Sequence, residues 1–123
     1  MIQENKELLL RDLCGRLPYF TMINVNGETQ VLNSICDDDG FYFNFSRDND
    51  NNEGYNLDEI KPYLFPMSSM TEEQEIEFKN TCNGYCEYYW TEETFDWLNK
   101  NHFDYRGLIK KDLANDATGL NIY

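Results

Sequence analysis

Residues 19–35 read YFTMINVNGETQVLNSI, and this stretch predicts a β-hairpin. Tyr19–Val25 is rich in the aromatic and β-branched residues that favour strands, and Thr29–Ile35 has a similar character. Asn26-Gly27 stands between the two runs, and this dipeptide accepts the positive φ angles of a two-residue hairpin turn. We therefore expect two antiparallel strands joined at Asn26-Gly27.

The segment before the hairpin has the apolar spacing of an amphipathic helix. Gly15 and Pro18 predict where this helix ends, because glycine and proline interrupt helices. We therefore expect a helix over residues 4–15. Its predicted apolar face consists of Leu10, Leu13, Cys14 and Leu17.

The segment after the hairpin alternates turn-forming and strand-forming residues. Cys36–Gly40 has the composition of a turn, and Phe41–Phe45 alternates in a way that predicts a strand with one aromatic face. Asp48–Gly54 is a polar loop, after which Tyr55–Ile60 predicts a short fourth strand. These elements together predict an antiparallel meander of three or four strands.

Two prolines separate this β region from a helical region. Pro62 and Pro66 bracket Tyr63-Leu64-Phe65, which we interpret as an extended apolar connector. Thr71 then begins a capping box that predicts a helix over residues 72–82, and Asn83-Gly84 predicts its end.

A second capping residue, Thr91, predicts a helix over residues 92–101, with Phe95, Leu98 and His102 on one face. Between the two helices, Tyr85–Trp90 could form an additional short strand. The predicted fold is α+β, in one domain over residues 1–123. It comprises an N-terminal helix, a small antiparallel β-meander or partly closed barrel, two helices and a packed C-terminal tail.

The charge is strongly negative, with a net value of −13. Residues 37–59 and residues 71–96 each contain eight acids and one base, so each segment has a net charge of −7. Such a field repels nucleic acids and anionic membranes and attracts a protein partner with a basic surface. Acidity that serves solubility alone is the competing interpretation.

The sequence also favours the cytoplasm. No apolar stretch approaches the length of a membrane span, and residues 1–6 lack the basic and apolar regions of a secretory signal. Because a cytoplasm keeps thiols reduced, we expect no disulfide, although Cys82 and Cys86 are only four residues apart. This spacing is not a C-x-x-C motif, and we expect neither a metal nor another cofactor.

One loop resembles a calcium-binding loop. Asp48–Glu59 places oxygen ligands at its positions 1, 3 and 5 and an acid at position 12. Glu53, however, occupies position 6, where the sharp turn requires glycine. We therefore expect a solvated hairpin loop and keep calcium binding as an alternative.

Candidate catalytic groups are sparse. His102 is the only histidine and would have to serve as base for any cysteine or serine nucleophile. Its predicted apolar face indicates a packed side chain instead. Ser68-Ser69 precedes the Thr71 capping box, which favours a role as hydrogen-bond acceptors at the helix start. The sequence therefore predicts a non-enzyme.

Aromatic side chains offer the best candidate contact surface, because tyrosine and tryptophan dominate interface hot spots. We predict that Tyr88 and Tyr89 are exposed, since neighbours on a strand point to opposite sides. Acids near the two helix starts complete the candidate site. The predicted partner-binding residues are Tyr88, Tyr89, Glu72, Glu73, Glu92 and Glu93.

Four blocks of the chain resemble one family. They are residues 8–19 (LLLRDLCGRLPY), 60–73 (IKPYLFPMSSMTEE), 95–109 (FDWLNKNHFDYRGLI) and 116–123. The resemblance is to small uncharacterised proteins encoded in gut Bacteroides genomes, including phages and other mobile elements. It implies a bacterial cytoplasm and a phage-related or accessory role, and it transfers no catalytic residue.

Three functions follow as hypotheses. The leading one is a non-catalytic acidic accessory protein that binds another protein with a basic surface. The second is a nucleic-acid mimic, whose carboxylates imitate phosphates to occupy a DNA-binding protein. The third is a small enzyme or a calcium-binding module that uses the Asp48–Glu59 loop.

Overall fold

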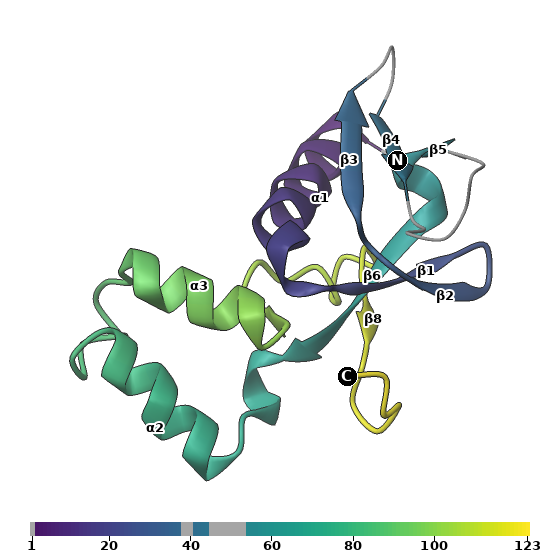
Figure 1. The fold of residues 1–123 in the computed structure, drawn as a ribbon. Helices are drawn as coiled ribbons and strands as arrows, with labels where there is room; N and C mark the ends of the chain where they lie inside the picture. The colour runs from purple at the N-terminus through teal and green to yellow at the C-terminus, as the bar shows by residue number, and fades with distance from the viewer. Residues whose placement is uncertain (1, 38–40, 45–53) are drawn as a thin grey trace.

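A computed structural model describes residues 2–37, 41–44 and 54–123, and it has the predicted α+β class. Helix α1 (Gln3–Arg16) lies beside the strands, as Figure 1 shows. Helices α2 (Glu72–Thr81) and α3 (Glu92–Lys100) extend away from the sheet as a pair. The helical boundaries predicted from capping residues therefore agree with the structure to within two residues.

The predicted hairpin turn is confirmed. Strands β1 (Met22–Val25) and β2 (Glu28–Val31) pair antiparallel, with Val25 opposite Glu28. Asn26 and Gly27 have φ angles of 50° and 91°, as the primed two-residue turn requires. The second run is shorter than predicted, because β2 ends at Val31 and a separate strand begins at Ser34.

That separate strand belongs to a second, three-stranded sheet. Strand β3 (Ser34–Asp37) pairs with β4 (Phe41–Asn44), which pairs with β5 (Gly54–Tyr55), both antiparallel. Cys36 and Asp37 are therefore strand residues rather than part of a turn. The rest of the predicted turn and the loop from Asp48 to Glu53 lie outside the described residues.

The predicted fourth strand is correct only at its start. After β5 the chain forms a 3₁₀ turn, η2 (Leu57–Glu59), before it becomes extended again. Asn56 caps this turn, since its backbone N–H donates to Glu59 Oε2 at 3.0 Å. The cap redirects the chain into the strand that follows.

The Pro62–Pro66 connector is the main error of the sequence interpretation, because these residues belong to the central strand β6 (Ile60–Pro66). Residues 60–62 pair antiparallel with β1. Residues 63–64 pair parallel with β8 (Asn115–Asp116), and residues 65–66 with β7 (Phe103–Asp104). Each proline thus stands at the end of a paired stretch, where its missing N–H interrupts the ladder least.

The main sheet has five strands and is mixed rather than purely antiparallel. Its order is β2-β1-β6-β7, and β8 also pairs with β6. The sheet does not close into a barrel. Because β7 and β8 follow α3 in the chain, the parallel pairing returns the C-terminal segment to the middle of the fold, as Figure 1 shows.

The buried face of α1 differs from the predicted face by one position. The buried residues are Leu9, Asp12, Leu13 and Arg16, whereas Cys14 is exposed. Their spacing is still that of one helix stripe, but half of the stripe is charged. Leu9 and Leu13 join the main core with Ile23, Val25, Leu32, Leu57, Ile60, Leu64, Leu108, Leu113 and Ala114.

Gly15 does not end α1, which continues to Arg16 and then tightens into the 3₁₀ turn η1 (Leu17–Tyr19). Gly15 instead faces α3. A Cβ atom at this position would lie 3.4 Å from Asn99 Nδ2, an ordinary van der Waals distance, so the two helices are in contact here.

The predicted packed tail is confirmed, and it consists of β7, β8 and turns. Asp104 organises it, since both carboxylate oxygens accept backbone N–H groups, from Leu108 at 2.9 Å and from Ile109 at 3.0 Å. Leu108, Leu113 and Ala117 are buried behind this turn. Across the described ranges, no helix is long and apolar enough to cross a membrane.

Candidate functional site

The α2–α3 hairpin, residues 71–100, carries all the predicted partner-binding residues. Its helices begin at threonines because hydroxyl oxygens can accept the unpaired N–H groups of a first turn. Thr71 Oγ1 accepts from Gln74 N at 3.2 Å, and Thr91 Oγ1 accepts from Thr94 N at 3.2 Å. Both predicted caps are therefore confirmed.

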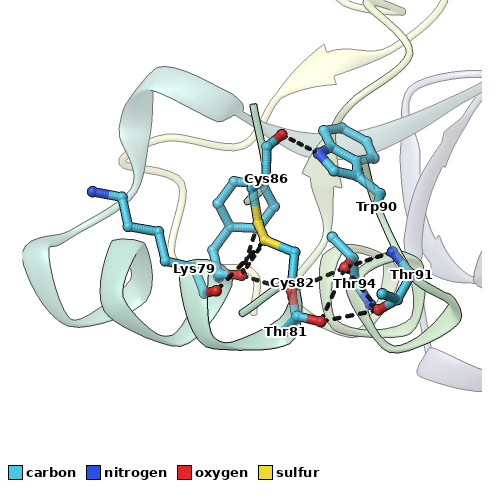
Figure 2. Close-up of a disulfide and its surroundings, with 8 residues drawn as sticks. Lys79, Thr81, Cys82, Cys86, Trp90, Thr91 and Thr94 are labelled. Carbon is cyan, nitrogen blue, oxygen red and sulfur yellow. Dashed lines mark hydrogen bonds between the residues drawn. A yellow bond between two sulfur atoms is a disulfide. The ribbon is translucent and has the colours of Figure 1, made fainter. Parts of the chain in front are cut away.

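Threonine hydroxyls also tie the end of α2 to the start of α3. Thr91 Oγ1 donates to the carbonyl of Thr81 at 3.0 Å, and Thr94 Oγ1 accepts from Thr91 N at 3.0 Å. Thr81 Oγ1 lies 3.1 Å from Thr94 Oγ1, and the Thr94 side chain is fully buried. Figure 2 shows this cluster beneath the loop that joins the helices.

Cys82 and Cys86 form a disulfide in that loop, contrary to the prediction of reduced thiols. Asn83 and Gly84 adopt φ angles of 52° and 83°, and Gly84 N donates to the carbonyl of Lys79 at 2.8 Å. This left-handed turn reverses the chain and leaves the two cysteine Cα atoms 5.3 Å apart, within the range for a disulfide. Figure 2 shows the resulting link.

The predicted strand at Tyr85–Trp90 is also wrong, because this segment consists of turns. The backbone N–H groups of Tyr88 and Tyr89 both donate to the carbonyl of Tyr85, at 2.9 and 3.1 Å. Tyr88 is 81% exposed and Tyr89 is 50% exposed. Both tyrosines reach solvent as predicted, but a tight turn rather than strand alternation exposes them.

The surface of the hairpin is strongly acidic. All eight acids of residues 71–96 are exposed, and Lys79 is the one base in this segment, so the net charge is −7. Only one carboxylate, Glu77, has a hydrogen bond to an aromatic side chain, from Trp97 Nε1 at 3.2 Å, among the described contacts. The exposed acids are Glu72, Glu73, Glu75, Glu77, Glu87, Glu92, Glu93 and Asp96.

The structure brings together only part of the predicted site. Glu92 and Glu93 lie in the first turn of α3, and Trp90 and Thr91 separate them from the exposed tyrosines of the loop. Glu72 and Glu73 lie in the first turn of α2, at the opposite end of a ten-residue helix. Since a helix rises 1.5 Å per residue, about 15 Å of α2 separates this second pair from the loop.

The loop end of the hairpin also contains an open hollow of about 450 Å³. We call it the Trp90 hollow. The sequence indicated only that aromatic residues are dense here, and it did not indicate that they border a surface depression. The lining residues are Cys86, Glu87, Tyr88, Tyr89, Trp90 and Phe95.

His102 does not share a face with Phe95 and Leu98. The helix ends at Lys100, and His102 follows in a left-handed conformation with a φ of 63°. Its ring stacks on Tyr123 with centroids 3.7 Å apart. Burial, together with the positive charge of Arg16, lowers the pKa of His102 to about 4. The packed character predicted for this histidine is thus present, but the partner is the C-terminal tail.

Ser69, another candidate, has a local structural role. Its Oγ donates to the carbonyl of Pro66 at 2.6 Å, next to η3 (Met67–Ser69), and its described hydrogen bonds include none from the first turn of α2. Within the described ranges, no group of three or more histidine, cysteine or acidic residues is placed to hold a metal. Half of the calcium-like loop, residues 48–53, lies outside those ranges.

Comparisons of the chain with protein-family models, with curated proteins and with solved structures found no match. The candidate site therefore has to be judged on its own geometry and charge.

Proposed function

We propose that this chain is a non-catalytic accessory protein that binds a basic segment of another protein through the loop end of its α2–α3 hairpin. The observation that carries the proposal is the coincidence of exposed acids and exposed aromatic side chains on one short element. Glu92 and Glu93 are exposed within five residues of the exposed Tyr88 and Tyr89 in the chain. Acids attract and orient a basic partner, and tyrosines supply the contact area.

The way the hairpin is held supports this proposal. The Thr81–Thr91–Thr94 hydroxyl cluster fixes the loop relative to both helices whether or not the Cys82–Cys86 disulfide is formed. A rigid surface loses less conformational entropy on binding than a mobile one, so more of the contact energy contributes to affinity.

The test uses a short peptide of alternating lysine and arginine, with binding measured by calorimetry. We expect the double variant Glu92→Gln/Glu93→Gln to weaken binding about fivefold, because each charge near an exposed site contributes a fraction of a kcal/mol. The matched control is Glu4→Gln/Glu7→Gln, which removes two exposed acids from the first turns of α1. Equal weakening by both pairs would show that net charge alone, not the hairpin, attracts the peptide.

The two acidic segments do not need to act together in this proposal. The acids Asp58 and Glu59 belong to η2, which lies between β5 and β6 and away from α2 and α3 in Figure 1. We therefore favour recognition by the hairpin over a nucleic-acid mimic, which requires one continuous row of phosphate-like charges.

A non-catalytic role agrees with the state of His102. A general base works best when its pKa lies near the working pH, and burial holds the pKa of His102 at about 4. A calcium-binding role for Asp48–Glu59 is tested separately, by the melting temperature of the protein in millimolar calcium. A rise there would support the calcium alternative.

We further propose that the protein is cytoplasmic and has a phage-related or accessory role. Cytoplasms keep thiols reduced, whereas disulfides persist in oxidising compartments. The Cys82–Cys86 pair therefore reports location. Alkylation of thiols in intact expressing cells should modify both cysteines if the chain is cytoplasmic, and a protected pair would place it in an oxidising compartment.

A further inference from the structure

The Trp90 hollow combines four aromatic residues with one carboxylate. Tyr88, Tyr89, Trp90 and Phe95 supply the rings, and Glu87 supplies the charge. The face of an aromatic ring is electrostatically negative, so rings and a carboxylate around one space together favour a cation. Tryptophan is the most favourable of the aromatic residues for such contacts.

Contacts within the protein fix the position of the Trp90 side chain. Its indole Nε1 donates to the carbonyl of Cys86 at 3.0 Å, a bond visible in Figure 2. Its ring also meets Phe78, Phe95 and Tyr105 at centroid distances of 5.9, 5.4 and 5.9 Å, all in edge-to-face arrangements. The main wall of the hollow is therefore rigid.

The surroundings are negative as well. Glu92, Glu93 and Asp96 are exposed within six residues of Trp90 in the chain. The lining residues within the described part of the chain include no base, and Figure 2 shows Lys79 extending away from Trp90. A cation in the hollow would thus meet no like charge from the lining.

A cation that contacts both an aromatic ring and a carboxylate already occurs elsewhere in this protein. The guanidinium carbon of Arg106 lies 4.6 Å from the centroid of the Tyr105 ring, while Nη1 donates to Asp12 Oδ1 at 2.8 Å. An arginine therefore contacts an aromatic face and a carboxylate at the same time, next to the residue that packs against Trp90.

We propose that the Trp90 hollow binds an arginine side chain of the basic partner. This proposal rests on the proposed function and deepens it by assigning an anchor residue to the partner. Arginine fits better than lysine because its planar guanidinium stacks on aromatic faces and is less strongly hydrated than an ammonium. Glu87 pairs with the guanidinium while the rings of Trp90 and Tyr89 cover its faces.

The experiment compares an oligo-arginine peptide with an oligo-lysine peptide of equal length, both titrated into the full chain. We expect the arginine peptide to bind about fivefold more tightly, from one cation–π contact of ordinary strength. In ¹⁵N-labelled protein, it should shift the indole N–H signal of Trp90 and leave that of Trp97 in place.

Variants of exposed residues avoid the folding defect that replacing Trp90 itself could cause. Tyr89→Leu and Glu87→Gln should abolish the arginine preference. Glu72→Gln removes the same charge as Glu87→Gln but lies outside the hollow, so it should retain the preference. A hairpin that binds both peptides equally, and is weakened equally by Glu87→Gln and Glu72→Gln, would overturn the arginine site but leave the proposed function standing. Binding of neither peptide would overturn both.

Discussion

The guanidinium of Arg16 and the carboxylate of Asp12 form an ion pair in which both side chains are completely buried. Arg16 Nε donates to Asp12 Oδ2 at 2.8 Å, and Nη2 donates to the carbonyl of Phe103 at 2.6 Å. Arg106 completes the group from the C-terminal segment, at 2.8 Å from the same carboxylate. This pair therefore joins α1 to the segment that follows α3.

Replacement of Asp12 by asparagine should destabilise the fold strongly. The variant leaves the Arg16 charge buried without its counter-charge, and such losses cost about 3–5 kcal/mol of unfolding free energy. Urea unfolding at neutral pH measures the change. Glu4→Gln, an exposed substitution in the same helix, should change the unfolding free energy by less than about 0.5 kcal/mol.

An apolar replacement of both partners separates the charge effect from packing. Asp12→Leu/Arg16→Met removes both buried charges together, so it should cost less than Asp12→Asn alone. A double variant that is no more stable than Asp12→Asn would show that hydrogen bonds to Phe103 and Arg106, rather than charge balance, account for the cost.

This pair also explains why the face of α1 was predicted one position away. Hydrophobic periodicity counts aspartate and arginine as surface residues, so it does not identify a buried face that includes Asp12 and Arg16. The i, i+4 spacing of opposite charges was visible, but such pairs usually lie on exposed faces. Only the tertiary contact with Phe103 shows that this one is buried.

The strand β6 was also predicted wrongly, because Pro62 and Pro66 argued against a strand although residues 60–66 are mainly apolar. Local rules exclude proline from a central strand, whereas the change of pairing partners along β6 depends on residues far away in the sequence.

Sequence signals correctly predicted the features that depend only on nearby residues. Asn26-Gly27, Thr71 and Thr91 act within a few residues, and all three behaved as predicted.

The candidate site was predicted in composition but not in shape. Exposed tyrosines and acids follow from residue type, and the structure exposes both Tyr88 and Tyr89. The disulfide was excluded on the assumed redox compartment, although the turn at Gly84 brings Cys82 and Cys86 together. Trp90, which lines the hollow, is positioned by contacts with Phe78 and Tyr105, which lie far apart in the sequence.

Stability should fall as the pH drops from about 6.5 to about 4, because of His102. Burial lowers the pKa of His102 in the folded state to about 4, below the value of an unfolded histidine. Within that window the unfolded chain binds a proton that the folded chain does not, so acid favours unfolding. Above the window both states are neutral, and the contribution is fully present.

His102→Asn isolates this effect, since asparagine tolerates the left-handed backbone at this position. The difference in unfolding free energy between the native protein and this variant should be largest near neutral pH and shrink towards pH 4. A difference that stays constant across the window would contradict a lowered pKa. An NMR titration of the His102 ring provides the direct value.

Reduction of the Cys82–Cys86 disulfide should lower stability by about 2 kcal/mol, the amount that closure of so short a loop contributes in the chain-entropy account. Thermal melts with and without reductant measure the change. Cys82→Ala/Cys86→Ala should melt like the reduced protein and should no longer respond to reductant. Cys14→Ser is the control, because Cys14 is exposed and free, and this variant should keep the full response.

The hydroxyl of Thr94 should be needed to keep α2 and α3 together. Thr94→Val preserves the shape of the side chain but leaves the partly buried Thr91 N–H without its acceptor, at a cost of about 1 kcal/mol. Thr94→Ser keeps the acceptor and should retain most of the stability. Hydrogen exchange gives the sharper readout, because amides in the first turn of α3 should exchange faster in Thr94→Val than in Thr94→Ser. Equal exchange in the two variants would mean that packing, rather than the hydroxyl cluster, holds the helices together.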